Sequence, residues 1–219
     1  MTLIAVDGPA GSGKSSAAKG AARALGLRYL DTGAMYRAMT WWMLQAGVPV
    51  DDPEAVAARA GDPVIEVGAD PEAPTIFVDG TDVSGPIRTR EVSNAVSAVA
   101  SVPAVRRRLV ELQRDVIGAG DIVVEGRDIG TVVAPDAPVK VFLTASEQVR
   151  AQRRAKDLVA DPAASIDITL AEQARRDRLD STRKASPLLK APDAVEIDST
   201  ALGLDAVIEK IVRLAKERS

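Results

Sequence analysis

Short apolar runs alternate along the chain with longer segments in which apolar residues recur every three or four positions. The short runs are typical of strands buried on both faces of a sheet, and the longer segments have the spacing of helices that cover it. The pattern therefore predicts an α/β fold with a five-stranded parallel sheet covered by helices. The predicted strands are residues 3–6, 28–30, 122–124, 139–143 and 194–197.

The predicted helices have recognisable ends. Gly26 and Gly47 each follow a helical segment, and glycine readily adopts the left-handed conformation that ends a helix. Asp52 and Pro53 open another helix, because aspartate caps free N–H groups and proline is tolerated in the first turn. The predicted helices are residues 15–25, 34–46, about 51–61, 89–100, 103–117, 146–159 and 169–183, and a last helix after residue 197.

The pattern changes between residues 63 and 85. Two short β-like runs, 64–67 and 75–78, are separated by glycine, proline and acidic residues, and Asp79-Gly80 is a turn signal that leads into 81–83. We therefore expect a small antiparallel insertion within a single α/β domain.

A phosphate-binding loop lies between the first predicted strand and the first predicted helix. Gly8-Pro9-Ala10-Gly11-Ser12-Gly13-Lys14-Ser15 has the complete form G-x-x-x-x-G-K-S. Its glycines let successive backbone N–H groups point at a triphosphate, and the helix that follows offers its positive end to the same anion. Lys14 is expected to reach the transferable phosphates, and the Ser15 hydroxyl is placed to hold Mg²⁺.

Composition excludes several kinds of chemistry. The 219 residues, 46% of them hydrophobic, can bury one sizeable core, but they include no cysteine and no histidine. Disulfides, thiolate zinc sites, histidine metal ligands and a Ser-His-Asp triad are therefore excluded. Catalysis is left to carboxylates, lysines, arginines, hydroxyls and a bound metal.

Net charge and aromatic content limit the kinds of partner that the chain can bind. The net charge is −3 and only 3% of residues are aromatic, so neither a basic field nor a stacking surface favours nucleic acid. Trp41 and Trp42 are expected to pack rather than to stack on a base. No apolar run approaches the length of a membrane span, and no secretion signal is evident. We expect a soluble, cytoplasmic monomer without a nucleic-acid or membrane partner.

Two further motifs follow predicted strands, at the edge of a parallel sheet where ligands bind. Residues 31–37 follow the second strand and place Arg37 one helical turn inside the next helix, on the side of the phosphate loop. Residues 125–128, Glu-Gly-Arg-Asp, end the third strand. A carboxylate there can orient Mg²⁺, directly or through water, and Arg127 can neutralise a phosphoryl oxygen.

An ordered set of motifs extends over nearly the whole chain. The phosphate loop alone is shared by many ATPases and GTPases, but the set is much more specific, and it resembles that of the bacterial cytidylate kinases, within the nucleoside monophosphate kinase family. Besides the loop it comprises LDTGAMYR at 30–37, DVSGPIR at 82–88, EGRDIGTVV at 125–133, PDAPVK at 135–140, and Arg176-Asp177 with Asp180, Arg183 and Pro187-Leu188.

The resemblance implies a P-loop kinase organised as one domain, residues 1–219. Its implied parts are a core (1–31, 103–152 and 170–219), a monophosphate-binding subdomain with the β-rich insertion (32–102) and a mobile lid (153–169). A polar break at Asp161-Pro162 separates two arginine-bearing helices, so we expect residues 155–168 to be the most mobile part of the unliganded chain, followed by 63–85.

The resemblance also implies a reaction, ATP-dependent phosphorylation of CMP and of dCMP with Mg²⁺ as cofactor. Thr32, Arg106 and Asp128 would contact the cytosine. The implied catalytic residues are Lys14, Arg127, Arg176 and Arg183, and the implied metal ligand is Ser15. The implied ATP-binding residues are Gly8, Pro9, Ala10, Gly11, Ser12, Gly13, Lys14, Ser15, Ser16, Arg153 and Arg154. The implied CMP-binding residues are Thr32, Tyr36, Arg37, Arg106, Arg127, Asp128, Arg176, Asp180 and Arg183.

Two other functions remain open at the level of sequence. Another small-molecule P-loop kinase, for uridylate, adenylate or shikimate, would share the fold but lack the base contacts of Arg106 and Asp128. A nucleotide-dependent switch would use the phosphate loop without a second substrate. The Asn-Lys-x-Asp run that would favour a GTPase is absent from the sequence.

Overall fold

The computed structural model describes residues 1–157, 166–183 and 186–218. The side chains of 154–157, 166–169, 172, 173 and 176 also lie outside this description. The expected mobility of 155–168 falls largely on residues outside it and stays a prediction.

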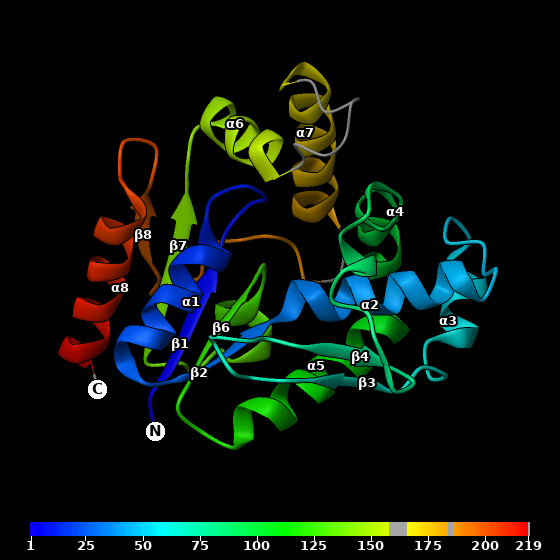
Figure 1. Ribbon diagram of the computed structural model, residues 1–219, viewed down its shortest axis with the longest axis horizontal. Helices are drawn as coiled ribbons and strands as arrows, with labels where there is room; N and C mark the ends of the chain where they lie inside the picture. Colours follow the sequence, from blue (N-terminus) through cyan, green and yellow to red (C-terminus); the bar gives the residue numbers. More distant parts are fainter. Residues whose placement is uncertain (158–165, 184–185, 219) are drawn as a thin grey trace.

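Five parallel strands form the central sheet (Figure 1). β1 (Leu3–Asp7) lies in the middle, between β6 (Ile122–Gly126) and β7 (Val139–Thr144). β2 (Arg28–Asp31) forms the edge beyond β6, and β8 (Val195–Asp198) forms the edge beyond β7. This confirms the predicted sheet, and because all five strands run in one direction, their carboxyl ends meet at one edge.

Helices cover both faces of the sheet, as the sequence pattern predicts. α1 (Lys14–Leu25) and α8 (Leu204–Arg218) pack together on one face, where they bury Ile4 and Val6 of β1. α2 (Thr32–Gln45), α4 (Arg90–Ser101) and α5 (Pro103–Gly118) belong to the cluster that buries Leu3 and Ala5 on the opposite face. Alternate residues of one strand thus enter two separate apolar cores.

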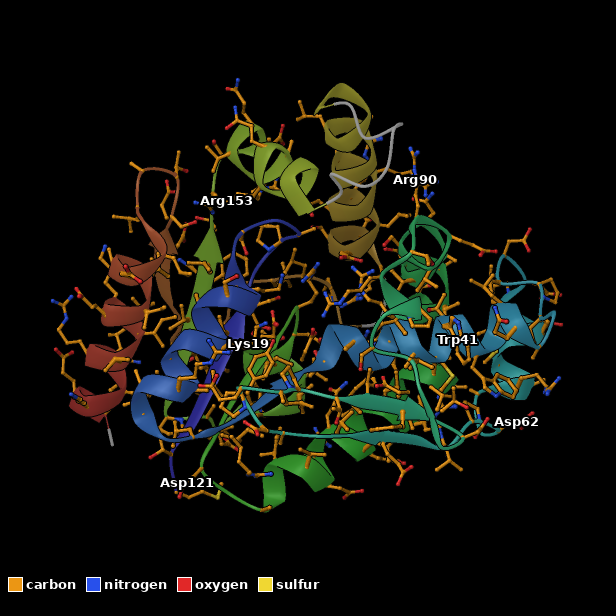
Figure 2. All side chains as sticks on the ribbon, viewed as in Figure 1. Lys19, Trp41, Asp62, Arg90, Asp121 and Arg153 are labelled. Carbon is orange, nitrogen blue, oxygen red and sulfur yellow. The ribbon has the colours of Figure 1, made fainter. Side chains whose placement is uncertain are left out.

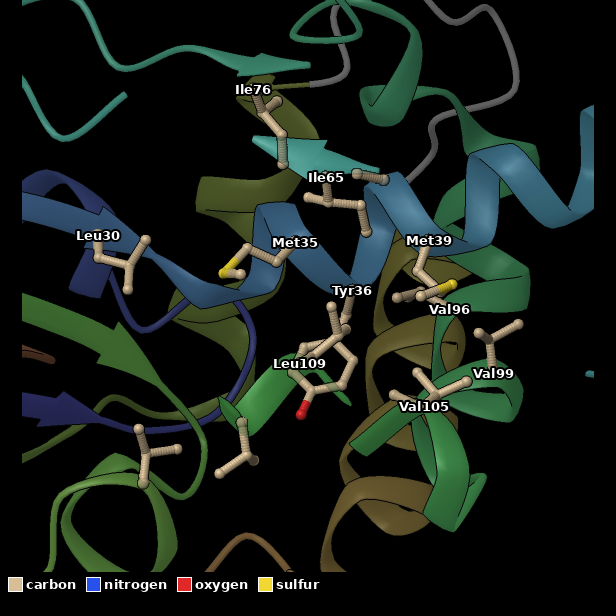
Figure 3. Close-up of a cluster of buried hydrophobic side chains, with 14 of the residues drawn as sticks. Leu30, Met35, Tyr36, Met39, Ile65, Ile76, Val96, Val99, Val105 and Leu109 are labelled. Carbon is tan, nitrogen blue, oxygen red and sulfur yellow. The ribbon is translucent and has the colours of Figure 1, made fainter. Parts of the chain in front are cut away.

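The larger core holds the helices of the second face against the insertion (Figure 3). Burial of each such apolar side chain stabilises the fold by about 1.5–3 kcal/mol. Trp41 and Trp42 pack against this core, half-buried, as expected. Its buried side chains include Met35 and Met39 from α2, Val96 and Val99 from α4, Val105 and Leu109 from α5, and Ile65 and Ile76 from the insertion.

The insertion is a three-stranded antiparallel sheet, which confirms the prediction for residues 63–85. Its strands are β3 (Ile65–Val67), β4 (Ile76–Val78) and β5 (Thr81–Asp82), paired in that order. Asp79 and Gly80 both have positive φ, as a tight turn between β4 and β5 requires. Before the insertion, α3 (Pro53–Arg59) is capped by Asp52, whose side chain accepts hydrogen bonds from two backbone N–H groups.

The remaining elements surround the carboxyl edge of the sheet. α6 (Glu147–Asp157) and α7 (Ile166–Thr182) lie beyond the ends of β1 and β7 (Figure 1). Two short helices were not predicted: a 3₁₀ turn, η1 (Pro86–Arg88), and a π-helical turn, η2 (Ile129–Val133), that follows β6.

Within the described ranges, no helix combines the length and the apolar character needed to cross a bilayer.

The loop after β1 passes very close to the backbone of β7. Gly8 has a φ of 153°, and a Cβ atom built on it would lie 2.1 Å from the carbonyl oxygen of Leu143. No side chain can move aside to relieve that contact, because the neighbour is backbone. Gly8 therefore fixes how the phosphate loop sits on the sheet.

We predict that Gly8→Ala lowers the free energy of unfolding by about 1–3 kcal/mol, because the added methyl group must push the loop away from β7. Urea denaturation measures the loss. Gly118→Ala is the matched control: a Cβ there meets nothing within 4 Å at the end of α5, so stability should hold or rise by up to about 1 kcal/mol. Equal stabilities for the two variants would contradict the close approach.

Candidate functional site

A cavity of about 740 Å³ lies at the carboxyl edge of the sheet. The loops that follow β1, β2 and β6 line it, together with parts of α4 and α5 and the segment after β8. Eight basic and four acidic side chains are among its described lining residues. The cavity therefore has an excess of positive charge in a chain whose net charge is −3, which suits anionic ligands.

The phosphate loop supplies one end of this cavity. Gly11 and Gly13 have φ angles of 72° and 88°, which side chains rarely adopt, and Gly13 caps α1 without a side-chain hydrogen bond. The start of α1 therefore presents backbone N–H groups and the positive end of its dipole to an anion. Lys14 is buried, and its Nζ lies 3.1 Å from the carbonyl oxygen of Pro9, back along the loop.

Behind the loop, β6 and β2 place a buried carboxylate against Ser15. The Ser15 hydroxyl donates to Oε2 of Glu125 at 2.9 Å, and the Tyr29 hydroxyl donates to Oε1. Burial raises the pKa of Glu125, and the nearby Asp31 carboxylate raises this pKa further. Hydroxyl and carboxylate oxygens are the ligand types that Mg²⁺ takes in kinases, alongside water and phosphate oxygens. Ser15, with Glu125 behind it, therefore fits a Mg²⁺ ion carried by a nucleotide.

The other end of the cavity contains a buried ion pair. Arg106, from α5, donates through Nη2 to Oδ2 of Asp128, and both side chains are about 5% exposed. The Arg106 guanidinium also lies over the ring of Tyr36, 5.3 Å from its centroid. A second arginine approaches the same carboxylate, with Nη2 of Arg183 at 3.9 Å from Oδ1 of Asp128.

Two of the donors in this cluster are left without an acceptor. Nε of Arg106 and Nη2 of Arg183 are buried and make no hydrogen bond to any residue that the structure describes. Burial lowers the pKa of Arg183, and the neighbouring charge of Arg106 lowers this pKa further. Buried donors without acceptors are rare in native proteins. Both side chains line the cavity, so an anionic or carbonyl-bearing ligand there would satisfy them.

A second acidic residue positions two more groups. Asp180, from α7, accepts a hydrogen bond from Nε of Arg127 at 3.1 Å and another from the Ser97 hydroxyl at 3.3 Å. Arg37, from α2, donates to the Ser93 hydroxyl of α4 at 2.9 Å. Arg127, Arg37 and Asp180 all line the cavity. Contacts within the protein therefore hold two arginines in place at the site.

Thr32 begins α2 and faces the end of β6. Its hydroxyl donates to the backbone carbonyl of Glu125 at 2.7 Å. Because that bond uses the only hydroxyl proton, Thr32 can only accept a hydrogen bond from a ligand.

Helix α6 contacts the phosphate loop from above. In Figure 2, Arg153 lies beside α6, near the segment that follows β8. Its Nη1 donates to the Ser12 carbonyl at 3.1 Å and to the Ser199 hydroxyl at 2.9 Å. One turn earlier, Arg150 donates to the Ala10 carbonyl and pairs with Asp177 of α7. Both α6 and α7 are therefore tied to the loop.

Most of the predicted site residues meet at this one cavity. Gly8 and Pro9 are not among its described lining residues, and Gly8 instead supports the loop from β7. The side chains of Arg154 and Arg176 lie outside the described part of the chain. The predicted residues that line the cavity are Ala10, Gly11, Ser12, Gly13, Lys14, Ser15, Ser16, Thr32, Tyr36, Arg37, Arg106, Arg127, Asp128, Arg153, Asp180 and Arg183.

Some residues of the site were not predicted. Ser199, Ser97 and Arg88 line the cavity, and Asp7 is buried at the end of β1. Ser199 follows β8, so the rule that parallel strands end at the site could have indicated it. Ser97 lies within a regular helix, and nothing in the local sequence distinguishes it.

Comparison with known proteins gives the family. The family model described as "Cytidylate kinase" matches residues 4–217. This chain belongs to the cytidylate kinase family. Curated cytidylate kinases of Streptomyces coelicolor and Streptomyces avermitilis are 57% and 55% identical to it, and each alignment covers 99% of this chain and 93% of the relative. The cytidylate kinase of Mycobacterium leprae is 54% identical, with 99% and 96% covered.

Solved structures extend the likeness at the level of fold. An uncharacterised protein of Eubacterium ventriosum aligns with a TM-score of 0.54 at 14% identity, and the alignment covers 99% of both chains. At this identity the likeness shows a shared fold alone. The family membership therefore rests on the relatives in sequence.

We predict that Arg106→Met lowers the free energy of unfolding by about 3 kcal/mol or more, because it leaves the buried Asp128 charge without its closest partner. The double variant Arg106→Met/Asp128→Leu should recover most of this loss, which a urea-based double-mutant cycle measures. Lys190→Met is the control: it breaks an exposed pair with Glu196 and should cost less than about 1 kcal/mol. If Arg106→Met lowered the free energy of unfolding no more than Lys190→Met does, the importance of the buried pair would be contradicted.

Proposed function

We propose that this member of the cytidylate kinase family transfers the γ-phosphoryl group of ATP to CMP, and also to dCMP. The observation that carries the proposal is the arrangement of one cavity, with a phosphate loop at one end and an arginine-carboxylate cluster with unpaired donors at the other. A triphosphate and a second, smaller anion fit these two ends, and their phosphates would meet between Lys14 and Arg127.

The donor side fits ATP through the phosphate loop. The N–H groups at the start of α1 and the Lys14 ammonium bind phosphoryl oxygens, and Ser15 would hold the Mg²⁺ ion that accompanies ATP. Such an ion neutralises charge on the phosphoryl oxygens. Arg153 is placed to approach the same phosphates, because its Nη1 atom is already at the Ser12 carbonyl.

The acceptor side explains the preference for a nucleoside monophosphate. Arg37 and Arg127 hold the acceptor phosphate, while Asp180, and Arg176 by family resemblance, address the ribose. The attacking oxygen of the acceptor belongs to a phosphate that is already ionised. No strong general base is therefore needed, and a chain without histidine lacks nothing for this reaction.

The base is recognised by the buried Arg106–Asp128 pair. Cytosine carries an amino donor at position 4, where uracil carries a carbonyl acceptor. Asp128 would accept from the amino group and repel the carbonyl, and the unpaired Nε of Arg106 would donate to the acceptor edge of cytosine at N3 or O2. The Thr32 hydroxyl, which can only accept, suits the same amino group.

Closure over the substrates completes the mechanism. α6 and α7 already contact the phosphate loop through Arg150, Arg153 and Asp177. A lid in this position excludes water, so the phosphoryl group passes to the acceptor rather than to a water molecule.

We predict that the purified protein with Mg-ATP phosphorylates CMP far faster than AMP, GMP or shikimate, as measured by coupled release of ADP. Lys14→Ala should lower kcat by about 100-fold or more, because it removes a charge aimed at phosphoryl oxygens in a site that excludes water. Lys216→Ala, at an exposed position of α8, should leave the rate unchanged. The assignment would be refuted by comparable turnover with AMP, or by a kcat of Lys14→Ala within about threefold of that of the unaltered protein.

We also predict that Asp128→Asn lowers kcat/KM for CMP by about 10- to 100-fold. The ratio of kcat/KM for CMP to kcat/KM for UMP should fall as well, because the new amide can donate to the uracil carbonyl. The KM for ATP should change little. Asp136→Asn, an exposed substitution of the same kind eight residues further on, should change none of these values. If kcat/KM instead fell by the same factor for CMP and for UMP, Asp128 would act on the phosphates rather than on the base.

A further inference from the structure

Asp7 is a buried acidic residue to which no role in the reaction has been assigned. It ends β1, lies opposite Gly126 of β6 in the parallel register, and is only 4% exposed. Its carboxylate accepts hydrogen bonds from the backbone N–H groups of Ile129 and Gly130, each at 2.8 Å. Asp7 is not among the described residues that line the cavity, so any effect on a nucleotide must pass through the chain that it binds.

The two amides belong to the first turn of η2, where N–H groups have no partner within the helix. Such groups are usually capped by the side chain of the residue just before the helix, and aspartate is among the best residues for this purpose. That residue here is Asp128, but its side chain makes no capping bond. It points to Arg106 and Arg183 instead.

Asp7 therefore performs the capping that Asp128 would otherwise perform. We propose that Asp7 is a positioning residue, which caps η2 from β1 and so keeps the Asp128 carboxylate directed into the acceptor-base part of the cavity. It sets the discrimination between CMP and UMP without touching the nucleotide. The inference rests on the proposed base-reading role of Asp128.

The chemistry of the contact requires an ionised carboxylate. Two N–H donors need two acceptor oxygens, and an asparagine would offer one acceptor and turn an NH₂ group toward the second N–H. Burial raises the pKa of Asp7 to about 6, and the two backbone N–H bonds oppose this shift. The carboxylate is thus ionised at neutral pH, in spite of its burial, and carries a function that a neutral residue cannot.

Charged groups face Asp7 from three sides. Asp128 raises its pKa further and Lys14, at the start of α1, lowers it. From β7, the stem of Lys140 packs beside Gly130 and Asp7, while its amino group is held by Asp193 and by the Pro135 carbonyl. Protonation of Asp7 below about pH 6 replaces one acceptor oxygen by an O–H group and leaves one amide of η2 without its partner.

The decisive experiment compares kcat/KM for CMP and for UMP in Asp7→Asn, Asp128→Asn, the double variant and the unaltered protein at pH 7.5. We expect Asp7→Asn to lower the efficiency with CMP by about tenfold, the effect of one lost hydrogen bond to a charged group, and to narrow the CMP to UMP ratio. The KM for ATP should stay within about twofold. Asp136→Asn, exposed on the same connection, is the matched control.

The double variant tests the route. If Asp7 acts through Asp128, adding Asp7→Asn to Asp128→Asn changes the ratio no further. An unchanged ratio in Asp7→Asn, or equal and additive effects of the two substitutions, would overturn the inference. An unaltered protein that fails to phosphorylate CMP would instead overturn the proposed function, so the two failures are distinguishable.

A titration of the unaltered protein gives a second test that does not depend on any variant folding. The CMP to UMP ratio should fall as the pH is lowered from 7.5 to 5.5, with a midpoint near 6. The 5′-phosphate is common to both acceptors, so its own titration cancels in the ratio. Asp7→Asn should abolish this pH dependence, and a ratio that stays constant across the range in the unaltered protein would also overturn the inference.

Thermal unfolding separates this role from a merely structural one. The pKa of Asp7 is raised in the folded state, so its contribution to stability is present at low pH and is lost as the pH rises through about 6. At pH 8, Asp7→Asn relieves the cost of a buried charge but leaves one N–H group of η2 without an acceptor. These two effects oppose each other, so the unfolding temperature should stay close to that of the unaltered protein. A lower CMP to UMP ratio in a variant of undiminished stability is the expected signature of positioning.

Discussion

The parallel pairing of β2, β6 and β1 is the constraint on which the site depends. In this register Asp31 lies opposite Glu125, and Asp7 lies opposite Gly126, so three strands end at the same level. The phosphate loop, the start of α2 and the Arg127–Asp128 segment leave the sheet from these ends. Residues more than 90 positions apart therefore meet within hydrogen-bond distance, as Thr32 and Glu125 do. A shift of one residue in any of the three strands would separate them.

Such convergence concentrates charged side chains, several of them buried, at one edge of the sheet. The carboxylates keep the arginines of the site in place before any substrate arrives: Asp128 binds Arg106, and Asp180 binds Arg127. Each of these pairs leaves part of the guanidinium for a ligand, because an arginine has five N–H donors. The site is thus preorganised for anions, and binding them requires little rearrangement of side chains.

Much of this architecture was predictable from sequence, because it follows from local patterns. Apolar runs located all five strands, Gly26 and Gly47 marked helix ends, and Asp79-Gly80 marked the turn of the insertion. The phosphate loop and the segment 125–128 were predictable because both follow a strand directly. Their shared cavity then followed from the rule for parallel sheets.

The features that the sequence did not reveal are those that depend on distant partners. The hydrogen bonds from Ile129 and Gly130 to Asp7 join positions more than 120 residues apart, and η2 has no pattern of its own in five residues. Arg153 was assigned to the ATP side by resemblance, but its contact with Ser199 depends on how α6 lies over β8. Strand register and helix packing decide such contacts, and neither can be deduced from a local stretch of sequence.

The separation of the two apolar cores has a consequence for how such a protein can change. The phosphate loop and α1 rest on the core shared with α8, whereas Thr32, Tyr36, Arg37 and Arg106 are carried by helices of the opposite core. The sheet lies between these two cores, and α7 links the phosphate loop to α4 through Asp177 and Asp180. Substitutions that repack α2, α4 and α5 can therefore reshape the pocket for the second nucleotide while the loop stays as it is. The pocket for the second nucleotide can therefore change in evolution while the phosphate loop is retained.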